Sequence, residues 1–361
     1  MLLSALGFSF AALVLAGIGW FLAGRKSARV RPDATAKSTA AQSPPLPELV
    51  DSFENAFYQL VLPRGRGTGE TRSDSVIHAF RDQHEKLAED PTLLPRQPLI
   101  LPKLLRLVKH ESGNAQALKA IILEDPGLTA DVLKMANSPL YRNTRESVND
   151  LDYAIIMLGI DGLKSLISAT IMRPIFKASD RRDKQTTNLL WEYALASAFT
   201  AQRFETKCET KSDMKSGSKH SAKPSASDAF SAHLLTLLSC IAELIIVQTT
   251  LRLFDEHQEP IDLETFAYLN QHFRYPISQQ LMKTWCLDED LINQLSDPKQ
   301  LQPTSMTTAQ DLGRIFGRAR VLREHGDLAL EEIESTVKEM QLESKLVDFL
   351  LAGGDDQRAV G

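Results

Sequence analysis

An apolar segment at residues 230–247 constrains the fold more than any other feature of the chain. It contains no lysine or arginine, and Glu243 is its only acidic residue. Because its apolar residues do not alternate with polar ones, the segment predicts a long helix that is buried on nearly all sides. The rest of the chain shows helical periodicity and no convincing alternating strand pattern. We therefore predict an all-α fold.

The composition indicates a globular protein. The chain has 361 residues, of which 43% are hydrophobic and 24% are charged, enough for one large domain or two modest ones. Its net charge of −5 argues against a dedicated nucleic-acid-binding protein, so no nucleic-acid partner is expected. The same charge does not exclude the binding of a small anion. The three cysteines are widely spaced and odd in number, which predicts reduced thiols rather than a disulfide framework.

A second apolar segment, residues 2–23, contains no charged residue. As a helix rising about 1.5 Å per residue it would span roughly 30 Å, the thickness of a bilayer core. Basic residues follow it and none precedes it: Arg25, Lys26, Arg29 and Arg31. This order favours a single-pass membrane anchor with the following residues in the cytoplasm, over a cleaved signal peptide or a buried core helix.

The anchor is followed by residues 24–47, which are rich in Ala, Thr, Ser, Lys and Pro and predict a flexible linker. Within the anchor, small residues recur at a spacing of four, as at Ala12 and Ala16 or Gly19 and Ala23. This spacing would let two anchors pack closely as a homodimer, although it is common by chance in such segments.

Beyond the linker, the helical spacing of apolar residues predicts helices along most of the chain. We divide them into a helical extension at 48–93, a domain at 94–300, and a C-terminal helical extension and tail at 301–361; the bounds of the domain are implied by a family resemblance rather than by the spacing. Asp125-Pro126 predicts a helix start, and Gly159 a break between two helices. The helices expected in the domain cover residues 99–110, 114–123, 125–137, 148–158, 161–172, 189–206, 230–253, 262–272, 278–285 and 288–295.

Residues 205–228 are expected to form a disordered insertion, because they contain almost no large apolar side chain to offset the entropy of ordering. Lysine recurs there at every fourth residue, from Lys207 to Lys223. One interpretation is a basic strip that touches anionic lipid headgroups. We favour a solvated loop, because acidic residues nearly balance the lysines.

Three short motifs occur in a fixed order: Asp125-Pro126-Gly127-Leu128-Thr129, Ala136-Asn137-Ser138 and Leu158-Gly159-Ile160. Their order and spacing resemble the HDOD (HD-related output domain) family, although no single motif is specific. The resemblance continues to about residue 295. It implies an HD-like helical bundle and a bacterial regulatory module, so the anchor would lie in a bacterial inner membrane.

Related phosphohydrolases carry a metal-binding His-Asp pair on a helix of this kind. The resemblance places Ser239 and Cys240 at that pair, and Tyr193 where another histidine is usual. A phenol and a hydroxyl are poor ligands for Mg²⁺ or Mn²⁺, and a thiol suits zinc. The resemblance therefore implies a degenerate site with no catalytic residue, no metal ligand and no cofactor.

Two weaker hypotheses concern other polar residues. His233 lies seven residues before Cys240 on the same predicted helix, so both could contribute to a zinc site. A buried histidine beside a buried cysteine is the more common arrangement. Arg142, Arg145 and Lys164 could contact an anion or a partner, or be solvated surface charges.

The leading hypothesis is a non-enzymatic, membrane-tethered signalling scaffold that binds a protein partner. The main alternative is a sensor that binds a nucleotide, for example a cyclic dinucleotide, in the vacated metal pocket. A residual metal-dependent phosphohydrolase is the least favoured reading.

Overall fold

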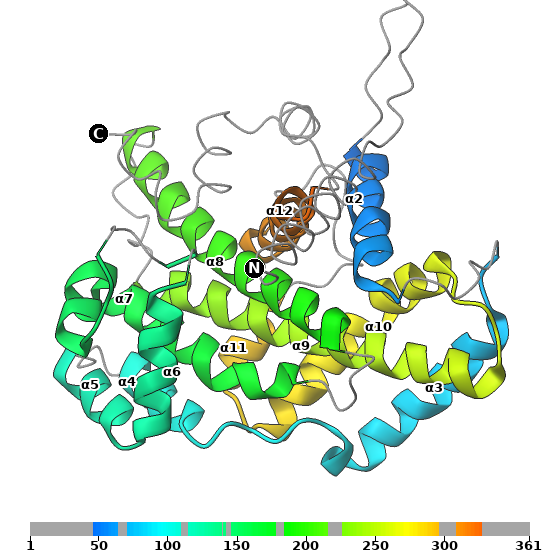
Figure 1. Ribbon diagram of the computed structural model, residues 1–361, viewed down its shortest axis with the longest axis horizontal. Coiled ribbons are helices and arrows are strands. Elements are labelled where there is room, and N and C mark those ends of the chain that lie inside the picture. Colours follow the sequence, from blue (N-terminus) through cyan, green and yellow to red (C-terminus); the bar gives the residue numbers. More distant parts are fainter. Residues whose placement is uncertain are drawn as a thin grey trace, which may run out of the picture. The chain divides into compact units, whose positions relative to one another are not determined.

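The computed structural model describes residues 46–63, 71–109, 115–138, 140–141, 146–177, 184–215, 226–295 and 308–326. These residues all belong to one compact unit, Pro44–Gly361. Within them the secondary structure consists of α-helices and two short 3₁₀ helices, without a β-strand (Figure 1). The predicted all-α fold is confirmed. The predicted anchor at 2–23 and the linker up to residue 45 lie outside the described residues.

The helices are, in chain order, α2 (Leu46–Val61), α3 (Asp74–Glu89), η1 (Pro91–Leu93), α4 (Leu101–Lys109), α5 (Ala115–Leu123), α6 (Pro126–Ala136), α7 (Leu151–Met172), η2 (Arg173–Phe176), α8 (Lys184–Lys215), α9 (Ala226–His257), α10 (Leu263–Thr284), α11 (Glu289–Asn293) and α12 (Ala309–Glu324).

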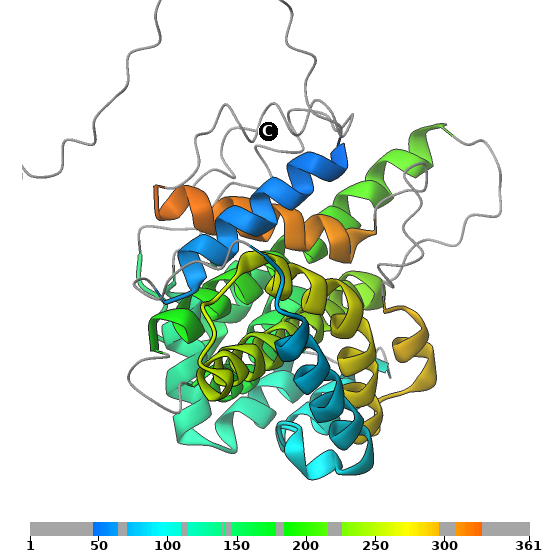
Figure 2. The ribbon, with the colours of Figure 1, turned by 90° about the vertical axis from the view of Figure 1, so that its right-hand side faces the viewer.

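Helix α9 lies at the centre of the bundle. It packs against α8 and α10 above all, and also against α3, α7 and α12. Nearly every residue from 229 to 247 is buried, because each face of the helix has a neighbour. The apolar segment 230–247 is therefore the core helix that its composition predicts. Figure 2 shows α2 and α12 together on one side of the bundle.

Two long helical stretches of the described residues are apolar enough to cross a membrane by length and composition alone, Leu151–Phe176 and Asp228–His257. The apolar window of the second is 89% buried inside the bundle, and that of the first 50%. Both contribute side chains to the core. Their apolar character is thus accounted for by packing against other helices.

The contact between α12 and α8 is the most extensive between helices of the described part of the chain. It is also unusually close. A Cβ atom on Gly317 would lie 2.1 Å from Ser197 Oγ, and a Cβ atom on Gly313 would lie 2.6 Å from Ser197 O. Two glycines four residues apart therefore let the α12 backbone approach α8, as small residues do at close helix crossings.

Several helix boundaries are confirmed. The side chain of Asp125 accepts a hydrogen bond from Gly127 N at 2.8 Å and caps α6, with Pro126 in the first turn. Gly159 has a φ of 69°, a left-handed conformation that interrupts α7 where the break was predicted.

The prediction of separate helices at 262–272 and 278–285 is wrong, since α10 continues through Pro276. Proline removes one backbone hydrogen bond and disfavours a continuous helix. Here both halves of α10 carry fully buried residues, such as Phe266 and Leu281, and their packing holds the helix together across the proline.

The predicted disordered insertion at 205–228 is wrong at both ends. Helix α8 continues to Lys215 and α9 begins at Ala226, while residues 216–225 lie outside the described part. The prediction considered only burial. Glu and Lys are good helix formers, and a helix that already exists grows without a new nucleation cost.

Asn137 fixes the chain after α6. Its Nδ2 donates to Leu133 O and to Val148 O, and its Oδ1 accepts from Val148 N, each at 2.8 Å. The Asn137 side chain therefore satisfies backbone groups at the end of α6 and ahead of α7. Asn137→Ala should lower the free energy of unfolding by about 1–3 kcal/mol, because it leaves partly buried backbone groups without partners. Urea unfolding measures the loss, and Asn149→Ala at an exposed neighbouring position should cost much less.

Candidate functional site

The three predicted positions of the former metal site converge. Tyr193 on α8 and Ser239 and Cys240 on α9 are all buried, with at most 2% of each residue exposed. They surround Glu243, which lies one turn after Ser239 on α9. Tyr193 Oη donates a hydrogen bond to Glu243 Oε2 at 3.0 Å. The centre of the site is therefore a carboxylate that the sequence comparison did not single out.

Glu243 is fully buried and its two oxygens accept three hydrogen bonds. Tyr58 Oη and Arg318 Nη2 donate to Oε1 at 3.0 and 3.1 Å, and Tyr193 Oη donates to Oε2. Burial alone would raise the pKa of Glu243, but the positive charges of Arg318 and Arg274 outweigh it and hold the pKa below its usual value. Glu243 is thus ionised at neutral pH.

Arg318 reaches this carboxylate from α12. Its Cζ lies 5.4 Å from the ring centroid of Tyr193 and 5.8 Å from that of Phe57. Its Nη2 also donates to Glu54 Oε1 on α2 at 3.2 Å. Burial would lower the pKa of Arg318, but Glu54, Tyr193 and Glu243 together keep it well above the usual value. The guanidinium is therefore a permanent charge between two carboxylates and two aromatic rings.

Arginines also lie near Ser239 and Cys240. Arg274 Nη1, from α10, donates to Ser239 Oγ at 3.0 Å. Burial, with the charge of Arg314 nearby, lowers the pKa of Arg274 to about 10, so it stays charged at neutral pH. Burial and the charge of Glu243 raise the pKa of Cys240 to about 12. At neutral pH Cys240 is therefore a thiol in these surroundings.

These residues do not fit a divalent metal ion. A catalytic Mg²⁺, Mn²⁺ or Zn²⁺ site needs carboxylates, imidazoles or thiolates with room for a water. The site instead holds the guanidiniums of Arg274 and Arg318 near Glu243, a carboxylate that already accepts three hydrogen bonds, and that of Arg314 near Cys240. Among the described residues no group of three or more His, Cys, Asp and Glu is placed to hold a metal ion.

The weaker hypotheses have different outcomes. Lys164 is buried on α7, and its Nζ donates to Asp161 Oδ1 at 2.8 Å, so its charge is already paired. Arg142 and Arg145 lie outside the described residues. The proposed anion contact is thus not assembled in the part of the chain that the structure describes.

His233 and Cys240 are both buried on α9 but have different surroundings. The backbone groups of Ser165 and Ala198 lie near His233, whereas arginines and Glu243 surround Cys240. Burial lowers the pKa of His233 to about 4, against the smaller opposing influence of those backbone groups. His233 is therefore a neutral core histidine at physiological pH, as the more common arrangement predicts.

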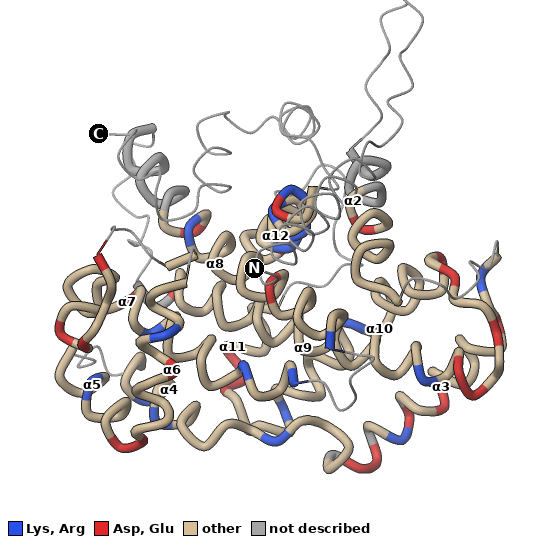
Figure 3. Tube along the Cα trace, in the orientation of Figure 1, with Lys and Arg blue, Asp and Glu red and all other residues tan. Residues whose placement is uncertain are grey.

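Sequence reasoning missed Glu243 and Arg318, although a signal existed for each. Glu243 is the one acidic residue in an apolar segment, and a buried charge requires a partner. Arg318 lies on α12, which carries many charged positions (Figure 3). The helix is nonetheless buried from residue 310 to 322. A charged helix with Gly313 and Gly317 four residues apart indicates close packing rather than an exposed extension.

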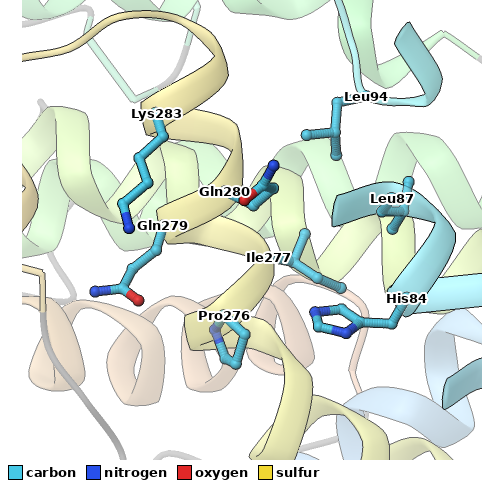
Figure 4. Close-up of a pocket in the computed structure, with 8 residues that line it drawn as sticks. All are labelled: His84, Leu87, Leu94, Pro276, Ile277, Gln279, Gln280 and Lys283. Carbon is cyan, nitrogen blue, oxygen red and sulfur yellow. The ribbon is translucent and has the colours of Figure 1, made fainter. Parts of the chain in front are cut away.

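Two cavities lie elsewhere on the molecule. One, of about 160 Å³, lies between α3 and α10, and Figure 4 shows His84 of α3 facing Pro276 and Ile277 of α10. The other, of about 440 Å³, is lined by Leu60, Lys184, Gln185, Asn188, Leu189, Glu192 and His325. Neither cavity is lined by Tyr193, Ser239 or Cys240.

Two solved structures resemble this fold. A protein from Shewanella amazonensis SB2B, provisionally described as a metal-dependent phosphohydrolase, superposes with a TM-score of 0.50 at 16% identity, over 78% of this chain and 96% of that one. An HDOD domain protein of unknown function from Geobacter sulfurreducens has a TM-score of 0.45 at 18% identity, over 75% and 94%. No curated protein matches the chain significantly.

The family model of the HDOD domain matches residues 94–300, more than half of the sequence. This range contains α4 to α11, with the core helix α9, and agrees with the domain predicted from the three motifs. The chain belongs to the HDOD family.

Proposed function

We propose that this protein is a non-enzymatic, membrane-tethered signalling scaffold whose HDOD domain binds another protein at the cytoplasmic face of a bacterial inner membrane. One observation carries the proposal. At the positions that the resemblance assigns to the metal site of a phosphohydrolase, the chain has Tyr193, Ser239 and a Cys240 thiol, with arginines nearby. A domain without metal ligands retains its helical surfaces, and these are what a partner can use.

The alternative is a nucleotide sensor at the same place. It is supported by the basic side chains that the site does contain, Arg274 and Arg318. Both already donate to protein acceptors, Ser239 and the two carboxylates, so a nucleotide would have to displace these contacts. We therefore rank the sensor below the scaffold, and a residual phosphohydrolase below both.

The catalytic part of the proposal is tested on the full-length protein in detergent. We expect substoichiometric bound metal by mass spectrometry, and no hydrolysis of bis-p-nitrophenyl phosphate or cyclic dinucleotides with Mn²⁺. Metal-dependent hydrolysis that Cys240→Ala abolishes would disprove it. Calorimetry with a nucleotide panel should show no heat, and a saturable signal that is lost in Arg274→Met would favour the sensor.

The scaffold itself is tested in the native host. The full-length protein should sediment with membranes, whereas a chain lacking residues 1–45 should be soluble. Cross-linking followed by affinity capture should recover one signalling protein reproducibly with the HDOD domain present. A protein fused to the anchor in place of the domain is the control, and equal recovery by both would contradict a partner of the domain.

A further inference from the structure

We propose that Arg318 supplies, from within the chain, the positive charge that an HD-type site takes from its metal ion. The residues near Tyr193, Ser239 and Cys240 do not fit a divalent cation, but they do surround a guanidinium. The site would then be a permanent organic cation centre rather than an emptied pocket. This arrangement does not depend on which partner the domain binds.

The geometry around Arg318 is that of a cation site. Its Nη2 lies 3.1 Å from Glu243 Oε1 and 3.2 Å from Glu54 Oε1, so two carboxylates from α9 and α2 share one guanidinium nitrogen. The rings of Tyr193 and Phe57 flank it within 6 Å of their centroids, where the ring quadrupole attracts a cation. Carboxylates and aromatic faces are the groups that a buried guanidinium requires.

The charges in this region balance without a metal. Glu243, Glu54 and Asp311 carry three negative charges, and Arg318, Arg274 and Arg314 carry three positive ones. Neutral donors make further contacts to these oxygens: the two tyrosine hydroxyls at Glu243, Asn270 Nδ2 at Glu54 and Thr308 Oγ1 at Asp311. A divalent ion would add two charges to a balanced, desolvated group.

Helix packing places Arg318 at this point. Ser197 lies one turn after Tyr193 on α8. Gly317, the residue before Arg318 on α12, packs directly against Ser197. Because no side chain separates the two backbones there, Arg318 begins close enough to α8 for its guanidinium to lie beside the Tyr193 ring. The close approach at Gly317 and the cation at Arg318 are therefore two parts of one arrangement.

Helix α12 therefore belongs with the domain, because it supplies the cation that pairs with a carboxylate of the domain. The family match ends at residue 300, but the carboxylate on α9 has its direct cation donor at residue 318. Glu54 on α2, before the start of the match, is the second acceptor. The helices outside the matched range thus complete the site.

Urea unfolding of the full-length protein tests the pair. Arg318→Met keeps most of the side-chain volume but leaves Glu243 buried without its cation. It should raise the unfolding equilibrium constant by about 10²- to 10³-fold. Adding Glu243→Gln should recover much of this loss, since an amide needs no counter-ion. Arg252→Met, an exposed arginine on α9 whose nearest carboxylate contact is 3.8 Å, is the control and should have little effect.

A second measurement distinguishes a cation site from an ordinary ion pair. Arg318→Ala should leave a space bounded by two carboxylates and two rings. Guanidinium ion at 10 mM should then raise the melting temperature of the variant but not of the wild type, and urea at 10 mM should not. In Arg318→Ala with Glu243→Gln the response should be lost. A similar response in all three proteins would overturn the proposal.

If Arg318→Met and Arg318→Ala are insoluble, the double variant Arg318→Met with Glu243→Gln tests the proposal. A soluble Arg318→Met with Glu243→Gln supports the proposal, and equal failure of the single and double variants contradicts it. The proposal would also be contradicted if the loss of unfolding free energy in the double variant equalled the sum of the losses in the two single variants. Hydrolysis by the wild type would instead contradict the non-enzymatic function and leave the coupling between Arg318 and Glu243 unaffected, so the two proposals fail by different observations.

Discussion

Gly317→Leu should detach α12 from the bundle. A Cβ atom at this position would lie 2.1 Å from Ser197 Oγ and 2.8 Å from both Ser197 Cα and Ser197 N. Two of these three atoms belong to the backbone of α8, so the clash is relieved only by moving one helix away from the other. Helix α12 would then lose its contact with α8 and withdraw Arg318 from Glu243.

We expect a loss of about 4 kcal/mol or more in the free energy of unfolding, at the upper end for single substitutions. Urea unfolding followed by circular dichroism measures it. Limited trypsin digestion should also cleave α12 at Arg314 or Arg320, which are buried in the wild type. Gly317→Ala should show a smaller loss in the same direction.

Two controls separate the clash from a general effect of replacing glycine. Gly162→Ala on α7 would meet only the Leu158 Cβ, at 3.0 Å, and should change stability little. Ser197→Gly in the Gly317→Ala background removes the closest contact but not the backbone ones, so it should restore only part of the loss. A Gly317→Leu protein with wild-type stability and wild-type trypsin resistance would show that α12 does not pack in this way.

Acid should destabilise the protein through His233. The folded protein holds the pKa of this histidine at about 4, whereas an exposed histidine titrates near 6.5. Between these pH values the unfolded chain binds the proton and the folded protein does not, so stability falls as the pH falls. The free energy of unfolding should fall by about 3 kcal/mol in total, and most of this loss is reached by pH 4.

Unfolding in urea at pH 7.5, 6, 5 and 4 measures this dependence. His233→Leu should remove up to one proton from the difference between the unfolded and folded states over that range. Carboxylates such as Glu243 also contribute in acid, but they are present in both proteins, so the difference between the two profiles belongs to the histidine. The control is His78→Leu at an exposed position of α3, which should keep the wild-type profile. Parallel profiles for wild type and His233→Leu would contradict a buried, neutral histidine.

The fold was predictable where one residue determines the local backbone. Asp125 accepts a backbone N–H and begins a helix, and Gly159 takes the left-handed conformation that ends one. Pro276 shows the limit of this reasoning, because its local preference is outweighed by buried side chains on both halves of α10. Those side chains reveal their burial only when their neighbours are known.

The site was predictable in one respect and not in another. The resemblance located Tyr193, Ser239 and Cys240, and the structure brings these three together. It did not indicate Arg318, because this residue comes from a helix beyond the matched domain. A salt bridge between residues 75 positions apart has no local signature, and only the isolated acidic residue in an apolar helix pointed to it.

The distance along the chain between Glu243 and Arg318 has a consequence for synthesis. The two residues are 75 positions apart, so a ribosome adding about 5–20 residues per second needs about 4–15 s to pass from one to the other. During that interval α9 exists while its charge partner does not. Until α12 is synthesised, the Glu243 carboxylate must stay hydrated or protonated. Helix α9 can therefore become fully buried only after α12, the last helix of the described residues, has been added.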